Sequence, residues 1–194
     1  HDTCRRQRQM CIRDRLPKPS WVSYEPQAKI LKKDVNWIDT SINTNWHLGA
    51  NALRDYCKNN KYKNQLLILN SPNNPTGTNN EELEELSNIC KENNIIVISD
   101  EIYTELDFNG NYHSISHFYP EGTIISSGLS KWCGAGGWRL GTLIFPKELK
   151  IIHDSVRSLA SETFTSVSAP IQYAAVKAYT CLLYTSPSPR DQLT

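Results

Sequence analysis

The stretch of sequence best suited to chemistry runs from Ser126 to Gly141 and reads SSGLSKWCGAGGWRLG. It sets Lys131 among small residues and places Arg139 eight positions later, in front of another short apolar run. Glycines permit close backbone approach and unusual backbone angles, at a cost in conformational entropy. A lysine amine becomes a nucleophile when it loses its proton, which desolvation beside a cation favours, and a guanidinium suits an anionic group. The pattern therefore predicts a site for a bulky anion, with a loose loop as the simpler alternative.

Two other polar clusters, NNPTG (Asn73–Gly77) and SDEIY (Ser99–Tyr103), directly follow short apolar runs. Taken singly, each has a structural interpretation: a turn built around proline, or a helix cap followed by a core tyrosine. A single lysine is also most often a solvated surface charge. The glycine-rich stretch fits neither G-x-x-x-x-G-K-[ST] nor G-x-G-x-x-G, so nucleotide binding is disfavoured.

The elements that must position these clusters alternate between apolar runs and helical patterns. Strands are predicted at 65–70, 94–100, 122–127 and 140–146, with a weaker one at 37–42, and helices at 47–60, 80–93, 147–160 and 168–179. Continuous apolar strands alternating with helices are typical of an α/β fold, a mostly parallel sheet with helices on both faces. Because ligands of open α/β sheets bind beyond the carboxyl ends of the strands, the three clusters are expected to converge there.

In this order the three clusters resemble the class I/II aminotransferases, fold-type I enzymes that use pyridoxal 5'-phosphate (PLP). Residues Gly128–Gly141 fit the cofactor-attachment pattern of that family at every restricted position, and PSWVSY (Pro19–Tyr24) looks like the segment that precedes the other motifs. The resemblance covers essentially all of 16–180. It implies the large domain of the family, in incomplete form.

The resemblance also implies roles for the residues around the lysine. Lys131 would hold PLP as a Schiff base, and its freed amine would then move a proton from the substrate Cα to the cofactor. Arg139 and Ser130 would bind the phosphate. The family often has serine at the position of Gly128, so any phosphate contact from that position must come from the backbone.

The other implied site residues are Asp100, Asn74 and Tyr103. Asp100 would pair with the pyridine nitrogen and keep it protonated, which makes the ring an electron sink. Asn74 and Tyr103 would both donate to the phenolic oxygen of the cofactor. His113 and His117 lack cysteine or carboxylate partners at ligand spacing, so no metal site is predicted.

The implied reaction transfers an amino group between an amino acid and a 2-oxo acid, both small molecules. Aspartate, alanine, aromatic and kynurenine-type substrates are all compatible with the motifs. The family further implies a homodimer with a role in amino acid metabolism and biosynthesis. Two alternatives remain: a fold-type I PLP lyase or aminocyclopropanecarboxylate synthase-like enzyme, which shares these residues, and a non-catalytic α/β module.

The two ends of the chain differ from its middle. The N-terminal stretch is basic, polar and without apolar periodicity, and the C-terminal one breaks off a helix and runs into Ser and Pro; MCIRDR and CLLYTSPSPRD resemble translated sequencing-adapter read-through. Residues 1–15 and 181–194 are therefore predicted to be non-native or disordered tails, and 16–180 a partial PLP-binding large domain. The family's upstream phosphate turn and its C-terminal arginine for the substrate carboxylate fall outside this segment. The fragment alone is thus expected to be inactive.

The composition limits which binding partners and which cellular compartment are expected. The chain carries 21 Lys+Arg against 20 Asp+Glu, so its net charge of +1 favours neither nucleic acid nor an anionic membrane. No apolar run approaches the roughly 20 residues of a membrane-spanning helix. The six cysteines form no C-x-x-C pair, which predicts free thiols in a reducing compartment. The cytoplasm is the default location, with an organelle as the alternative.

Overall fold

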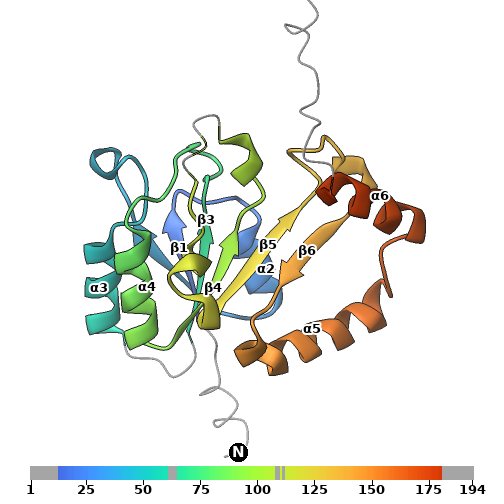
Figure 1. Ribbon diagram of the computed structural model, residues 1–194. Helices are drawn as coiled ribbons and strands as arrows, with labels where there is room; N and C mark the ends of the chain where they lie inside the picture. Colours follow the sequence, from blue (N-terminus) through green and yellow to red (C-terminus); the bar gives the residue numbers. More distant parts are fainter. Residues whose placement is uncertain (1–12, 61–64, 108–109, 111, 181–194) are drawn as a thin grey trace, which may run out of the picture.

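The computed structural model describes residues 13–60, 65–107, 110 and 112–180. Its centre is a sheet in the order β2-β1-β3-β4-β5-β6 (Figure 1). The strands are β1 (Arg13–Lys18), β2 (Val35–Asp39), β3 (Gln65–Asn70), β4 (Ile95–Asp100), β5 (Thr123–Gly128) and β6 (Gly141–Ile144). All neighbouring pairs are parallel except β5 and β6, which are antiparallel. The predicted α/β fold with a mostly parallel sheet is confirmed.

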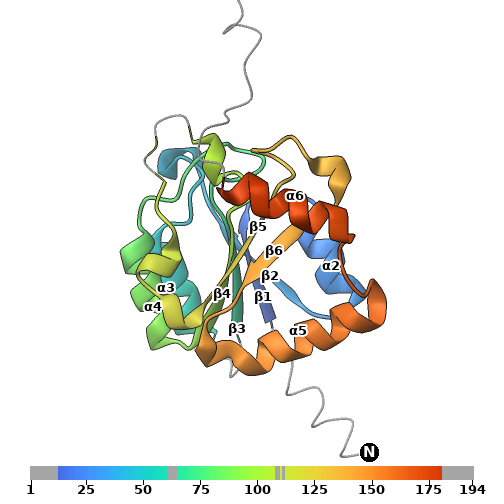
Figure 2. The same cartoon turned by 45° about the vertical axis from the view of Figure 1, so that its right-hand side comes forward.

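Helices lie on both sides of this sheet. They are α2 (Tyr24–Ile30), α3 (Ala50–Asn59), α4 (Leu83–Glu92), α5 (Lys150–Thr163) and α6 (Ala169–Thr180). Helices α3 and α4 lie together on one side, whereas α2 and α5 lie on the other (Figures 1 and 2). Within the described residues, no helix has the length and apolar character needed to cross a membrane.

The main core lies between the sheet and the α3–α4 layer. Leu67 and Val97 from the strands and Leu53 and Leu86 from the helices are all fully buried in it. Burial alternates along β3 and β4, because successive side chains of a strand point to opposite faces. The alternate side chains of these strands are only half buried. The second face of the sheet is therefore covered less completely than the first.

Large apolar side chains remain exposed around β6 and α5. None of the 14 residues of α5 is buried. Side chains that are about half exposed or more include Leu143, Ile144, Ile151, Leu159 and Phe164. Large exposed apolar side chains gathered on neighbouring parts of the chain typically mark a region that another protein segment covers.

Two elements were not predicted from the sequence, β1 and α2. Strand β1 begins at Arg13, so the predicted boundary at Leu16 falls inside a strand. Arg15 is fully buried and donates a hydrogen bond to Gln65, and its guanidinium carbon lies 4.9 Å from the ring centroid of Tyr56. Of the tails predicted for 1–15 and 181–194, residues 1–12 and 181–194 lie outside the described residues.

Three cysteines are described, and all three are free thiols. Cys57 and Cys90 are buried, whereas Cys133 is exposed. Burial raises the pKa of Cys90 to about 12, so this thiol stays protonated and unreactive at neutral pH.

Candidate active site

The carboxyl ends of three parallel strands lie side by side. Asn70, the last residue of β3, pairs with Asp100, the last residue of β4, and Asp100 pairs with Ser126 of β5. Because the polar clusters follow these strand ends, the predicted convergence of NNPTG, SDEIY and the lysine stretch is confirmed.

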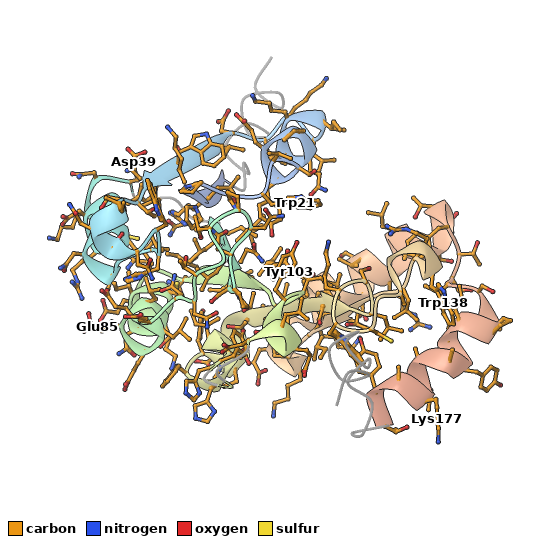
Figure 3. All side chains as sticks on the ribbon, turned by 90° about the horizontal axis from the view of Figure 1, so that it is seen from above. Trp21, Asp39, Glu85, Tyr103, Trp138 and Lys177 are labelled. Atoms are coloured by element: carbon orange, nitrogen blue, oxygen red, sulfur yellow. The ribbon has the colours of Figure 1, made fainter. Side chains whose placement is uncertain are left out.

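A cleft of about 430 Å³ opens at this edge of the sheet. All six predicted site residues line it, together with residues that the sequence did not single out. Its lining is Trp21, Tyr24, Asn70, Asn74, Asp100, Ile102, Tyr103, Ser126, Ser130, Lys131, Gly136 and Arg139. Viewed from above, Tyr103 lies near the middle of the molecule, below Trp21 and to the left of Trp138 (Figure 3).

Asp100 is a half-buried carboxylate held by neutral donors. The hydroxyl of Tyr24 donates to Asp100 Oδ2 at 2.5 Å, and the backbone N–H of Ile102 donates to Oδ1 at 3.3 Å. Burial raises the pKa of Asp100, and these two hydrogen bonds oppose that rise. A carboxylate that loses hydration without gaining a cation is destabilised, so this position favours a cationic ligand group.

Asn74 and Tyr103 lie next to each other on the cleft wall. The side-chain amide of Asn74 donates to the hydroxyl oxygen of Tyr103 at 3.3 Å. The backbone N–H of Asn74 donates to Asn70 Oδ1 at 2.7 Å, and Asn70 Nδ2 donates to the carbonyl of Asp100 at 3.0 Å. Asn70 therefore ties the turn that carries Asn74 to the end of the strand that carries Asp100.

Lys131 lies three residues beyond the end of β5 and faces Tyr103. Its Nζ is 5.3 Å from the centroid of the Tyr103 ring, within the range of a cation–π contact. The side chain is exposed, so the desolvation expected for a nucleophilic lysine is not provided by the described residues. Polypeptide or ligand from outside the described residues must cover Lys131 to exclude water from its amine.

The stretch between Lys131 and Arg139 is fixed in place, which excludes the loose-loop alternative. The N–H of Ala135 donates to the carbonyl of Leu129 at 3.2 Å. Leu129 and Ala135 also pack in a small buried cluster with Leu140 and with Ala175 of α6.

Arg139 adopts a backbone conformation that non-glycine residues rarely take. Its φ of 57° and ψ of 43° are left-handed, which costs about 1–2 kcal/mol for a residue with a Cβ. Its exposed guanidinium donates to the carbonyl of Gly136 at 2.8 Å. Backbone strain of this kind persists where the surroundings require it, often at binding sites.

Gly128 is a glycine for a steric reason. It pairs across the antiparallel strands with Gly141. A Cβ at position 128 would lie 2.7 Å from the carbonyl oxygen of Leu140 and 3.1 Å from the Gly141 Cα. Both atoms belong to the backbone and cannot rotate away, so this position offers a ligand only backbone groups.

We expect Gly128→Ser to lower the free energy of unfolding by about 1–3 kcal/mol, because the added side chain overpacks the β5–β6 pair. Urea unfolding measures the change. Gly137→Ser is the matched control, since a Cβ there meets no atom within 4 Å. Equal stability of the two variants would contradict the steric explanation.

Sequence reasoning assigned no role to six residues that line the cleft: Trp21, Tyr24, Asn70, Ile102, Ser126 and Gly136. Two of them belong to the quoted PSWVSY segment, and the ring centroids of Trp21 and Tyr24 lie 5.3 Å apart in an edge-on arrangement. Asn70 and Ser126 could have been found as the first polar residues at the ends of apolar strands. The described residues contain no group of three or more His, Cys, Asp or Glu side chains that could hold a metal ion.

Comparison with known proteins decides the family. The profile described as "Aminotransferase class I and II" matches residues 15–181. The chain belongs to the class I and II aminotransferases. This aminotransferase sequence spans 42% of the length of two curated relatives that it matches.

Individual aminotransferases show the same relationship. The chain is 35% identical over 170 residues to an aspartate aminotransferase of Bacillus sp. (strain YM-2), covering 84% of this chain. Its structure resembles an aspartate aminotransferase from Thermus thermophilus with maleate (TM-score 0.79, 29% identity, 88% of this chain and 44% of that one). It also resembles an aromatic aminotransferase from Pyrococcus horikoshii (TM-score 0.77, 31% identity, 94% and 47%).

The chemistry of the cleft fits the cofactor of this family, which is PLP. The cofactor combines an aldehyde, a phosphate and a basic ring nitrogen. The cleft combines a lysine, an arginine and a half-buried carboxylate without a charged partner among the described ion pairs. Each group of the ligand therefore finds a side chain of the type that binds it.

Proposed function

We propose that this chain is the cofactor-binding part of an aminotransferase that moves an amino group between an amino acid and a 2-oxo acid. One observation carries the proposal: Lys131, Arg139 and Asp100 line a single cleft at the ends of parallel strands. Membership of the class I and II family and the aminotransferase names of the relatives support it.

Lys131, Arg139 and Ser130 would hold the cofactor at its two reactive ends. The amine of Lys131 would attach PLP covalently, and after substrate exchange it would take the proton from the substrate Cα. The planar guanidinium of Arg139 and the hydroxyl of Ser130 would donate hydrogen bonds to the phosphate. When bound, PLP supplies the electron sink that makes loss of the Cα proton possible.

Asp100, Asn74 and Tyr103 would hold the ring of the cofactor. Asp100, as the anion, would keep the ring nitrogen protonated, because a positive charge beside a half-buried carboxylate relieves its desolvation. Asn74 and Tyr103 would direct their donors at the phenolic oxygen. The 3.3 Å contact between these two side chains supports a shared target.

The site calls for more polypeptide than this chain supplies. Arg139 is the single guanidinium among the described residues that line the cleft, so a phosphate and a substrate carboxylate would compete for it. We infer that 16–180 is a partial large domain, that a further segment and a second copy complete the site, and that the 194-residue chain alone is inactive. The complete enzyme would then be a cytoplasmic homodimer in amino acid biosynthesis.

Borohydride reduction tests the proposal in the full-length protein, meaning the chain that contains this segment at the length of its relatives. After incubation with PLP and reduction, peptide mass mapping should find the added mass on Lys131. Label on a different lysine, or no label, would overturn the assignment.

A further inference from the structure

We propose that Tyr24 is a positioning residue for Asp100, holding one oxygen of the carboxylate and favouring its ionised form. This inference rests on the proposed function, in which Asp100 faces the ring nitrogen of the cofactor. Tyr24 itself is not assigned contact with the substrate.

The geometry joins two elements that are far apart in the chain. Tyr24 is the first residue of α2, and Asp100 is the last residue of β4. Their side chains, 76 positions apart, meet through the 2.5 Å hydrogen bond from the Tyr24 hydroxyl to Asp100 Oδ2. Tyr24 is 7% exposed, and Trp21 packs edge-on against its ring at 5.3 Å. The ring is thus held so that its hydroxyl points at the carboxylate.

The surroundings of Asp100 make this hydroxyl its principal donor. The hydrogen bond from the backbone N–H of Ile102 to Asp100 Oδ1 is longer, at 3.3 Å. Lys131, Arg139 and Tyr103 line the same cleft, but none of the described ion pairs includes Asp100. A hydroxyl stabilises an anion without adding a charge, so it leaves the carboxylate free to attract a cationic ligand group.

The electrostatics of the pair agree with this role. Burial raises the pKa of Asp100, and the hydrogen bond from Tyr24 is the first influence that opposes the rise. Burial, together with the charge of Asp100, raises the pKa of Tyr24 far above its ordinary value. The tyrosine therefore stays protonated and remains a donor at neutral pH.

The first test measures the pKa of Asp100 directly in the cofactor-free, full-length protein. Carboxyl ¹³C NMR of aspartate-labelled protein follows the titration, and the signal missing from Asp100→Asn assigns it. We expect Tyr24→Phe to raise the pKa of Asp100. The matched control is Tyr103→Phe, which removes from the same cleft a hydroxyl that is hydrogen-bonded to Asn74 and should leave the pKa of Asp100 unchanged. An unchanged pKa in Tyr24→Phe would overturn the proposal.

A double-mutant cycle keeps the test decisive if Tyr24→Phe is less stable. Unfolding of Tyr24→Phe, Asp100→Asn and the double variant should show coupling at pH 7 that decreases when Asp100 is protonated at low pH. If the changes in unfolding free energy of the two single variants add up in the double variant at both pH values, the proposed interaction between Tyr24 and Asp100 is contradicted. With PLP bound, kcat of Tyr24→Phe should fall about tenfold with KM nearly constant, as expected for loss of one hydrogen bond to a charged group.

Failure of this inference is distinguishable from failure of the proposed function. The NMR titration and the unfolding cycle need no cofactor and no turnover. If Lys131 is not labelled by PLP while Asp100 responds to Tyr24→Phe, the pair exists and the enzymatic role is wrong. If Lys131 is labelled and Asp100 does not respond, the positioning role of Tyr24 is wrong.

Discussion

Lys131→Ala in the full-length protein is expected to reduce amino transfer by about 10⁴-fold, because the proposed base for the Cα proton is lost. The same variant should lose all borohydride-stable attachment of PLP. Its thermal stability should change little, since the side chain is exposed and its amine faces the Tyr103 ring at 5.3 Å from the centroid. Steady-state turnover with an amino donor and 2-oxoglutarate, together with the midpoint of thermal unfolding, measures both effects.

Lys147→Ala is the matched control for this experiment. Lys147 is also an exposed lysine, with its side chain 93% exposed and its Nζ 3.9 Å from Glu148. An isolated surface ion pair contributes little, so turnover and stability should both stay near wild type. Substantial turnover by Lys131→Ala would show that another residue carries the proton.

Asp100→Asn should lower turnover by about 10³-fold, because a neutral amide cannot stabilise a protonated ring nitrogen as a carboxylate does. The amide keeps the shape of the side chain and can still accept the hydrogen bond from Tyr24. The loss should therefore fall on kcat rather than on folding. Near-normal kcat would exclude Asp100 as the partner of the ring nitrogen.

The same substitution should stabilise the cofactor-free protein at neutral pH. The pKa of Asp100 in the folded state lies above its ordinary value of 3.8, chiefly through burial. When the pKa of a carboxyl is raised in the folded state, the free energy of unfolding falls as pH rises from about 3.8 through the folded-state pKa. Above that pKa the loss of stability stays constant. Asn carries no such penalty.

The unfolding midpoint of Asp100→Asn should accordingly exceed that of wild type at pH 7, and the difference should shrink as pH falls toward 3.8. Circular dichroism melts across this pH range provide the measurement. Saturating PLP should reverse the order at pH 7, since the cofactor stabilises the form that it binds more tightly. A variant less stable than wild type at pH 7 without cofactor would contradict the assigned cause of the pKa shift.

Much of the sheet could be predicted from local sequence. Strands β3, β4 and β5 are short apolar runs bounded by turn residues, and the structure finds them within a residue or two of the predicted bounds. Such runs need burial on both faces or nearly so, which few arrangements other than a parallel α/β sheet provide.

Strand β1 and helix α2 could not be predicted in this way. Strand β1 has the sequence RDRLPK, whose charged residues and proline give it a low local preference for strand. It nevertheless pairs with both β2 and β3. Pairing with two neighbours outweighs the weak local preference. Helix α2 has only seven residues and carries Pro26, which is tolerated because it lies in the first turn. The antiparallel direction of β6 could not be predicted either, because its apolar pattern is compatible with both strand directions.

The sequence by itself determined which side chains could do the chemistry, because each motif is a continuous stretch whose residue types and spacing can be read directly. Only the tertiary structure decided which further groups support them. Asn70 ties Asn74 to the end of β4, and Tyr24 reaches Asp100 from a helix 76 positions away. Contacts of this kind depend on the strand order and on where α2 lies beside the sheet, and long-range packing sets both.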